Sequence, residues 1–255
     1  MRRLVLAVLL LAPLASYADP CQYSAPRNLT FDLAGVREVQ VELRNHDLHL
    51  TGNDGAKGGS LTGKACASDA KLLDDLTVSQ HREGDRLVVE IGAEHTHVYL
   101  GYSSTELKVD MQMPSQIPVV LNVGSGDAWV TNFQRLSTKV GSGDVHVSKI
   151  SGPFALSVGS GDIDVNDVGS IDVGAVGSGD LKVNGVRGDA RVGSVGSGDI
   201  GLRGVGGNVR VDTLGSGDLN VHDVQGDFSL GAKGSGDVSH SGIKGKVSVP
   251  RDHDD

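Results

Sequence analysis

The sequence has few aromatic residues, only two cysteines, and no long hydrophobic segment beyond its first residues. One Trp, four Tyr and four Phe occur in 255 residues, so the chain offers few of the aromatic platforms on which sugar rings commonly stack. After the apolar run from Leu4 to Leu14, no stretch approaches the ~20 apolar residues that a membrane-spanning helix needs. The sequence therefore predicts a chain that does not insert into a membrane.

Positive charge is also scarce. The chain has 23 Lys+Arg against 32 Asp+Glu, and without Arg2 and Arg3 the count is 21 against 32, a formal charge of −11. Such a chain has few cations to replace the counterions of a nucleic acid, and an anionic membrane surface repels it. We therefore expect no nucleic-acid partner and no membrane binding.

Residues 1–18 have the features of a secretory signal peptide. Arg2 and Arg3 give a positive start, Leu4–Leu14 forms a short apolar core, and small residues flank Tyr17 before a cleavage site after Ala18. We therefore expect an exported protein, located in the periplasm, outside the cell or at the cell surface.

The two cysteines, Cys21 and Cys66, both precede the repeats described below. In an exported protein, such a pair more often forms a disulfide than a reactive thiol or a metal site. We expect a Cys21–Cys66 disulfide, which would stabilise the start of the fold by roughly 3–4 kcal/mol in the chain-entropy description.

The dominant feature of the sequence is the motif Gly-Ser-Gly-Asp, which occurs seven times. The copies begin at residues 124, 141, 159, 177, 196, 215 and 234, so their starts are 17, 18, 18, 19, 19 and 19 residues apart. This near-constant spacing is typical of a protein built from stacked structural repeats.

Each period divides into two short strands. In the period that starts at Gly177, Leu181 and Val183 alternate with polar residues, and after a bend Ala190 and Val192 do the same. Alternation with a period of two predicts strands with one buried face. Abundant Gly and β-branched residues, with no apolar spacing of 3.6, exclude helices from the repeats.

One such pair of strands cannot bury its apolar face, whereas stacked pairs bury a continuous column of Val, Leu and Ile. The sequence therefore predicts an all-β fold: a single-stranded parallel β-solenoid with about 18–19 residues per turn, in which seven regular turns follow irregular β-rich opening turns. The left-handed hexapeptide helix also has about 18 residues per turn but needs an apolar residue at every sixth position. Counting from Val176 or Leu181 reaches Lys182 and Arg187, so we reject this alternative.

The fourteen glycines of the motif copies need a physical reason, because each costs roughly 0.5–1 kcal/mol of backbone entropy in ordered structure. We expect two reasons. The first is a corner that requires positive φ, and the second is a neighbouring coil packed directly above it.

The chain is expected to divide into an irregular β-rich part over residues 19–113, the regular solenoid over 114–249 and a charged tail over 250–255. Arg44–Asp47, followed by Leu48 and Leu50, looks like a degenerate first copy of the turn. The Gly-rich segment from Asn53 to Lys64 is expected to be a loop.

The recurrent Ser-Gly-Asp followed by alternating aliphatic residues, as in residues 178–183, and the strand that ends at Pro114 resemble a known bacterial family. It is a family of β-strand-repeat domains of unknown function, described as "putative adhesins" and related to the head domains of autotransporter adhesins. The resemblance covers about Val36 to Val249. It implies an adhesin-like protein and provides no catalytic residues that could be transferred to this chain.

The aspartates that end the motif copies should stack into a ladder. They are Asp127, Asp144, Asp162, Asp180, Asp199, Asp218 and Asp237. Two unit charges ~4.8 Å apart repel by about 0.9 kcal/mol in water, so something must offset the repulsion. Either each carboxylate accepts hydrogen bonds from turn N–H groups, or the ladder binds cations, of which Ca²⁺ best suits oxygen ligands. Calcium-binding solenoids carry a different Gly-rich pattern, so we favour the first interpretation and keep Ca²⁺ as the alternative.

Other polar residues are weaker candidates. The motif serines, Ser125 through Ser235, have no recurring histidine beside them, so we expect turn residues rather than nucleophiles. Two histidine pairs have the spacing of metal ligands: His46 with His49, and His95 with His97. Neither pair has a clear third ligand nearby, and we expect surface residues.

The sequence thus predicts an exported, non-enzymatic, adhesin-like or structural protein of the cell envelope, with a protein or glycan partner. Among the aromatic residues, Phe154 and Phe228 fall at inward positions and should lie in the core. No nucleophile is paired with a base, and no cofactor is expected. The alternative is a module that binds Ca²⁺ or another ligand through the aspartate ladder.

Overall fold

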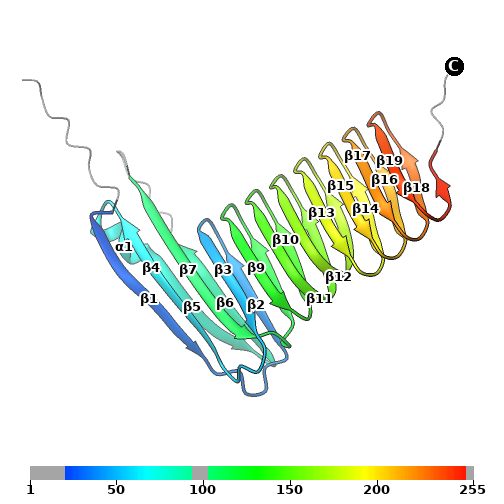
Figure 1. Cartoon of the computed structure of the whole chain (residues 1–255). Helices are drawn as coiled ribbons and strands as arrows, with labels where there is room; N and C mark the ends of the chain where they lie inside the picture. Colours follow the sequence, from blue (N-terminus) through cyan, green and yellow to red (C-terminus); the bar gives the residue numbers. More distant parts are fainter. Residues whose placement is uncertain (1–20, 94–102, 251–255) are drawn as a thin grey trace, which may run out of the picture.

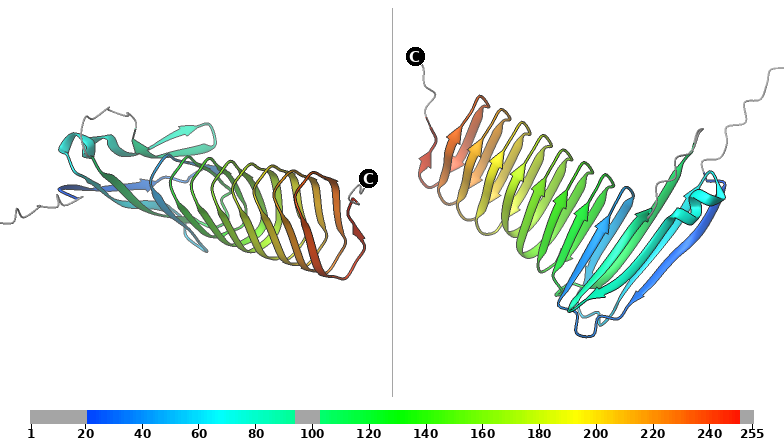
Figure 2. Two further views of the ribbon diagram at one scale, coloured as in Figure 1. Left: turned by 90° about the horizontal axis from the view of Figure 1, so that it is seen from above. Right: turned by 180° about the vertical axis from the view of Figure 1, so that it is seen from behind.

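The computed structural model describes residues 21–93 and 103–250. The signal peptide, His95, His97 and residues 251–255 lie outside the described residues. The chain forms a rod of stacked coils that is wider at its N-terminal end (Figures 1 and 2).

Each coil contributes one strand to each of two walls, which we call wall A and wall B. Wall A holds the strand before each turn, and wall B holds the strand after it. Neighbouring strands of a wall are parallel throughout the repeats. The prediction of a parallel β-solenoid is therefore confirmed.

The strands of the repeats have the following bounds. Wall A contains β2 (Glu38–Leu43), β8 (Val119–Val123), β10 (Leu136–Val140), the second halves of β11 (Val145–Val158) and β12 (Ile163–Val176), β14 (Ala190–Val195), β16 (Val209–Leu214), β18 (Phe228–Lys233) and β20 (Val247–Ser248). Wall B contains β3 (Asp47–Asn53), β9 (Ala128–Phe133), the first halves of β11 and β12, β13 (Leu181–Val186), β15 (Ile200–Val205), β17 (Leu219–Val224) and β19 (Val238–Ile243).

The core lies between the walls. A wall B strand typically buries three residues, as β12 does with Ile163, Val165 and Val168. The first two alternate as the sequence predicts. The third stays buried because Asp167, just before it, has a left-handed backbone (φ 58°), which shifts the alternation by one residue. Phe154 and Phe228 are fully buried, as predicted.

The left-handed position recurs in every coil. It lies five residues after each motif aspartate and is occupied by Asn132, Lys149, Asp167, Gly185, Gly204, Asp223 and Gly242. Positive φ therefore belongs to the second corner of the coil. Our expectation that the glycines of the Gly-Ser-Gly-Asp turn adopt positive φ is wrong, since none of them does.

Close packing explains the motif glycines instead. A Cβ atom on Gly143 would lie 1.8 Å from the carbonyl oxygen of Gly126, and one on Gly198 would lie 1.9 Å from that of Gly179. Successive turns are thus stacked backbone on backbone, as the second of our two reasons predicts. Any side chain at this position would separate two coils.

The first coil is formed by β2 and β3, and Arg44–Asp47 lies directly under the first full motif. The backbone N–H of Ser125 donates to the Arg44 carbonyl at 2.7 Å, and that of Leu48 donates to the Asp127 carbonyl at 2.9 Å. The prediction of a degenerate first turn is confirmed. His46 occupies the place of the packed glycine, and no motif copy lies before it in the chain.

His46 is buried, with 5% of its surface exposed, so our expectation of a surface residue is wrong. Burial lowers the pKa of its imidazole, and Asp47 and Glu106 oppose this effect. Within residues 21–93 and 103–250, its Nε2 atom has no hydrogen-bond partner. The side chain thus fills the end of the stack at an electrostatic cost.

Antiparallel strands widen the N-terminal end of both walls. Wall A continues from β2 to β6 (Arg86–Ala93) and then to β5 (Leu76–Glu83). Wall B continues from β3 to β7 (Thr105–Pro114), β4 (Gly59–Ala67) and β1 (Tyr23–Phe31). The expected loop from Asn53 to Lys64 is therefore mostly wrong, because β4 begins at Gly59.

Glycines in β4 serve close approach rather than a turn. A Cβ on Gly59 would lie 2.7 Å from the ring of Phe31, and one on Gly63 would lie 3.0 Å from the Lys108 carbonyl oxygen. The short helix α1 (Ala70–Asp75) connects β4 to β5 and is capped by Asp69, whose carboxylate accepts from the N–H of Lys71 at 2.8 Å.

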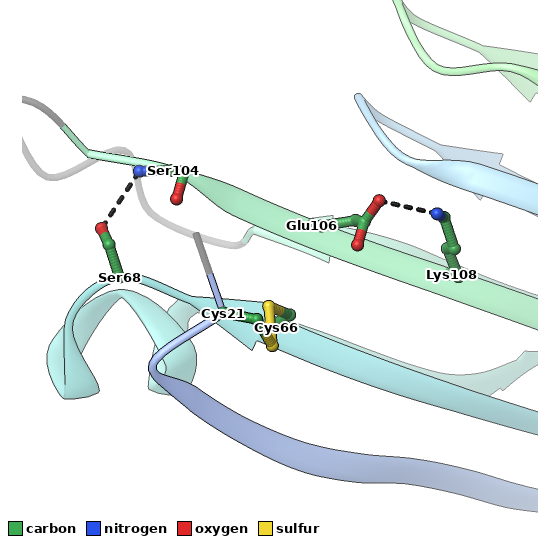
Figure 3. The surroundings of a disulfide bond; sticks show 6 residues. All are labelled: Cys21, Cys66, Ser68, Ser104, Glu106 and Lys108. Carbon is green, nitrogen blue, oxygen red and sulfur yellow. Dashed lines mark hydrogen bonds and ion pairs between the residues drawn. A yellow bond between two sulfur atoms is a disulfide. The ribbon is translucent and has the colours of Figure 1, made fainter. Parts of the chain in front are cut away.

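A disulfide joins Cys21, just before β1, to Cys66 on β4 (Figure 3). The Cα atoms of the two cysteines are 5.2 Å apart. On the far side of β4, the N–H of Ser104 donates to Ser68 Oγ at 3.1 Å and links the chain before α1 to the start of β7. The N-terminal strands are thereby tied together beyond their ladder hydrogen bonds.

Candidate functional site

The motif aspartates form a hydrogen-bonded ladder along the rod. In six successive steps, the Oδ1 atom of one aspartate accepts from the backbone N–H of the aspartate one coil further on, at 2.8–3.1 Å. Each bond ties two coils together at the turn. These are the contacts that our first interpretation of the ladder expects.

A second ladder at the opposite corner shows what the position requires. Asp189 Oδ1 accepts from the N–H of Asn208, Asn208 Oδ1 accepts from that of Asp227, and Asp227 Oδ1 accepts from that of Lys246, at 2.7–2.9 Å. The neutral amide of Asn208 makes the same bond as the charged carboxylates. An acceptor oxygen, rather than negative charge, is therefore the requirement in this second ladder.

The ladders do not gather into a metal centre in the described part of the chain. Among those residues, no three Asp, Glu, His or Cys side chains have an arrangement that could hold a metal ion. The motif serines are exposed at the turn, and Ser235 Oγ donates to Ser216 Oγ at 3.3 Å. The described residues also include no helix long and apolar enough to cross a membrane.

The largest hollow lies on the outer side of wall A near the N-terminal end. We call it the Glu42 groove; its volume is about 900 Å³, and β2, β5, β6, β8 and β10 contribute to it. The polar side chains that define it are Gln40, Glu42, His81, Glu83, Glu90, Asn122 and Lys139. It arises where the antiparallel β5–β6 pair meets the regular stack.

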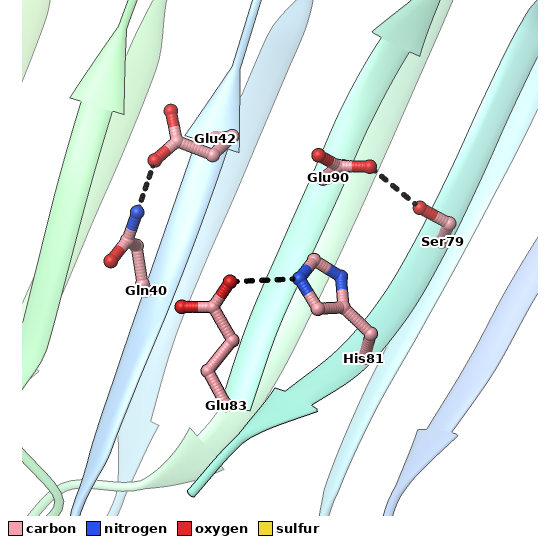
Figure 4. A network of polar contacts seen from close by, with 6 residues as sticks. All are labelled: Gln40, Glu42, Ser79, His81, Glu83 and Glu90. Atoms are coloured by element: carbon pink, nitrogen blue, oxygen red, sulfur yellow. Dashed lines mark hydrogen bonds and ion pairs between the residues drawn. The ribbon is translucent and has the colours of Figure 1, made fainter. Parts of the chain in front are cut away.

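Hydrogen bonds fix several side chains of the Glu42 groove (Figure 4). Glu42 Oε1 accepts from the amides of Gln40 and Asn122, each at 2.6 Å. Ser79 donates to Glu90 Oε2 at 3.1 Å. Glu42 and Glu90 are register partners on adjacent strands, so two like charges face each other, which is unfavourable without compensation. The groove therefore presents an ordered, hydrogen-bonding and mildly acidic surface.

A row of stacked rings lies on the outer side of wall B. His49, Trp129 and His146 are register partners on β3, β9 and β11. The centroid of the Trp129 ring is 4.6 Å from that of His49 and 5.6 Å from that of His146, with interplanar angles of 22° and 20°. Both faces of the indole are thus covered by imidazoles. His146 also contacts Asp164, with Nδ1 3.3 Å from Oδ2.

Beside these rings runs a second row of polar residues, and the space between the rows is a cavity of about 380 Å³. We call it the Trp129 trough. Its side chains come from His49, Thr51, Trp129, Val130, Thr131, His146, Val147, Ser148 and Asn166. In the polar row, Ser148 Oγ donates to Thr131 Oγ1 at 2.9 Å.

Neither hollow was predicted from the sequence. The Glu42 groove combines strands far apart in the chain, and no motif marks its residues. The ring row had a readable signal, because His49, Trp129 and His146 each lie two residues after the aspartate of a turn, at Asp47, Asp127 and Asp144. Equivalent positions of a solenoid stack, so their contact could have been inferred.

Comparison with known families assigns the chain to a class. Residues 65–243 match the family described as "Putative auto-transporter adhesin, head GIN domain". The match spans well over half of the 255 residues. The chain therefore belongs to this adhesin-like family.

Solved structures with a similar course of the chain include three of related description. A putative lipid binding protein from Parabacteroides distasonis is 17% identical, with a TM-score of 0.45, and the match covers 88% of this chain and 97% of that one. A putative adhesin from Bacteroides fragilis is 12% identical (TM-score 0.43; 90% and 98% covered). A putative cell adhesion protein from Clostridium sporogenes is also 12% identical (TM-score 0.34; 89% and 98% covered). No curated protein sequence matches the chain significantly.

Proposed function

We propose that this chain is an exported, non-catalytic, adhesin-like protein that binds a component of the cell envelope or cell surface through the outward side chains of its solenoid. One observation carries the proposal: the repeated residues are already used inside the fold. The motif glycines admit the neighbouring coil, and the motif aspartates accept hydrogen bonds from it. What remains for a partner is the set of outward residues, which differ from coil to coil.

The Glu42 groove is the part of this outer surface best suited to a partner. It is concave, its carboxylates and amides are held in place by one another, and Lys139 adds a cation on the strand beyond Asn122. Ordered polar groups lose little conformational freedom when a partner binds, which favours affinity. The described residues around it show no nucleophile hydrogen-bonded to a base, the arrangement that covalent catalysis needs.

Export is tested by following the full chain in the bacterium that produces it. We expect a mature protein that begins at Asp19, after cleavage behind Ala18, in the periplasm, in the medium or on the surface. Its N-terminus is read by mass spectrometry after fractionation. An intact Met1 N-terminus in the cytoplasmic fraction would refute export.

Binding is tested by incubating the purified mature protein with isolated envelope fractions and measuring the retained protein. Lys139→Glu reverses a charge in the Glu42 groove, and Lys182→Glu is a matched control because both lysines are exposed on outer strand faces. We expect saturable binding that Lys139→Glu weakens and Lys182→Glu leaves unchanged. Absence of saturable binding would refute the envelope role, and equal effects of the two variants would refute the location.

A further inference from the structure

We infer that the Trp129 trough is a binding site for a neutral saccharide. The inference deepens the proposed function and rests on it, because it names a ligand class for the outer surface of the solenoid. It concerns wall B, however, and involves none of the residues of the Glu42 groove.

The charge of the lining indicates a neutral ligand. In a chain with 55 charged Asp, Glu, Lys and Arg residues, 32 acidic and 23 basic, none of the nine residues that line the trough is one of these types. The nearest carboxylate along the ring row, that of Asp164, contacts His146. A charged ligand would find no fixed counter-charge among the lining side chains, whereas a neutral ligand needs none.

The hydrogen-bonding groups indicate a ligand rich in hydroxyl groups. Because Ser148 donates its proton to Thr131, the Ser148 oxygen keeps free lone pairs and the Thr131 hydroxyl proton is free to donate. Thr51 and Asn166 extend this row on the neighbouring strands. Such mixed donors and acceptors match the hydroxyl groups of a sugar, which both donate and accept.

The ring row supplies the apolar side of the site. Imidazoles cover both faces of Trp129, so a sugar cannot stack on the indole and must contact the ring edges and the floor formed by Val130 and Val147. A partly exposed Trp on a sheet surface is the residue type that most often dominates a binding site. The cavity of about 380 Å³ falls within the range of small-ligand sites.

The single Trp provides a direct assay. Trp129 is the only tryptophan in the sequence, so its fluorescence reports on the trough without background. The purified mature protein is titrated with maltotetraose, cellotetraose, mannotetraose and chitotetraose, and with tetragalacturonate as an anionic comparator. We expect a saturable emission change with a neutral tetrasaccharide and none with tetragalacturonate.

Variants that keep the tryptophan locate the effect. Ser148→Ala and Thr131→Val each remove one hydroxyl and should weaken the apparent Kd roughly three- to tenfold. Ser157→Ala is the matched control, because Ser157 is equally half-exposed on the same strand but faces outward from wall A. It should leave the Kd unchanged.

Two outcomes overturn the inference. One is no saturable change with any neutral tetrasaccharide up to about 10 mM, a concentration at which even millimolar binding would be visible. The other is a change that persists with the same Kd in both hydroxyl variants. If envelope binding and its loss in Lys139→Glu still hold, only the saccharide site fails. If saccharide binding holds without envelope binding, only the proposed envelope role fails.

Discussion

Replacing a single glycine tests how the coils are held together. Gly198 is the third residue of its motif copy, and a Cβ atom there would lie 1.9 Å from the carbonyl oxygen of Gly179, whereas real Cβ contacts essentially never fall below 3.0 Å. Gly198→Ala therefore forces the two turns apart by about 1.1 Å. The variant should be strongly destabilised.

The magnitude follows from the hydrogen bonds at that turn. The N–H groups of Gly196, Ser197 and Asp199 bond to the preceding coil at 2.8, 2.8 and 3.1 Å. A separation of about 1 Å breaks all three, and at about 0.5–1.5 kcal/mol each the loss is roughly 1.5–4.5 kcal/mol. This is a large share of the 5–15 kcal/mol stability of a typical domain.

Gly201→Ala is the matched control, three residues further along the same coil. A Cβ there meets nothing closer than 4.0 Å, and its backbone does not have positive φ. This variant should gain about 0.4–1 kcal/mol, because alanine restricts the unfolded chain. Urea unfolding followed by circular dichroism measures both. A Gly198→Ala variant within about 0.5 kcal/mol of the parent protein would refute the packing argument.

Three further predictions concern polar groups. Thr138 is buried with no hydrogen-bond partner for its hydroxyl among the described residues, so Thr138→Val should raise the free energy of unfolding by about 1 kcal/mol, measured as a higher urea midpoint at unchanged slope. Asp199→Asn should keep stability within about 0.5 kcal/mol while Asp199→Ala loses about 1 kcal/mol, and the melting temperature should be equal in calcium and in chelator; a rise with calcium would favour the cation-binding alternative. Burial lowers the pKa of His46, so the unfolded chain binds its proton more readily; stability should fall as pH drops below about 6.5, and a His46→Gln variant with the same pH profile as the parent would contradict this.

The architecture of the rod was predictable because each coil repeats the same physical problem. Alternation placed Leu181 and Val183 inside, and the spacing of the motif gave the length of a coil. The reason for the glycines was only half predictable. Positive φ falls at positions such as Lys149 and Asp167, where the sequence carries no glycine signal, because their backbone is set by the corner rather than by residue preference.

The irregular end of the rod was harder to predict. The glycines of β4 suggested a loop, but Gly59 and Gly63 lie within a strand because neighbouring chains approach closely there. His46 suggested the surface, but the place it occupies in the stack is buried. Both errors concern positions where contacts distant in the sequence outweigh local preference.

The candidate binding surfaces follow the same division. The aspartate ladder was visible in the sequence, and its hydrogen bonds are those of our structural interpretation. The Glu42 groove was not visible, because residues from Gln40 to Lys139 meet only after β5 and β6 join wall A. Motifs thus marked the scaffold, whereas the proposed partner surfaces come from outward positions that no motif distinguishes.

The central claim is that the repeats supply architecture and that outward residues near the N-terminal end supply binding. Deleting residues 181–199 tests it most directly, because the deletion removes one complete coil and joins Asp180 to Ile200 in the same register. The shortened protein is compared with the parent in urea unfolding and in envelope binding. Cooperative unfolding with undiminished envelope binding is the expected result, and loss of the folded state or of binding would contradict the claim.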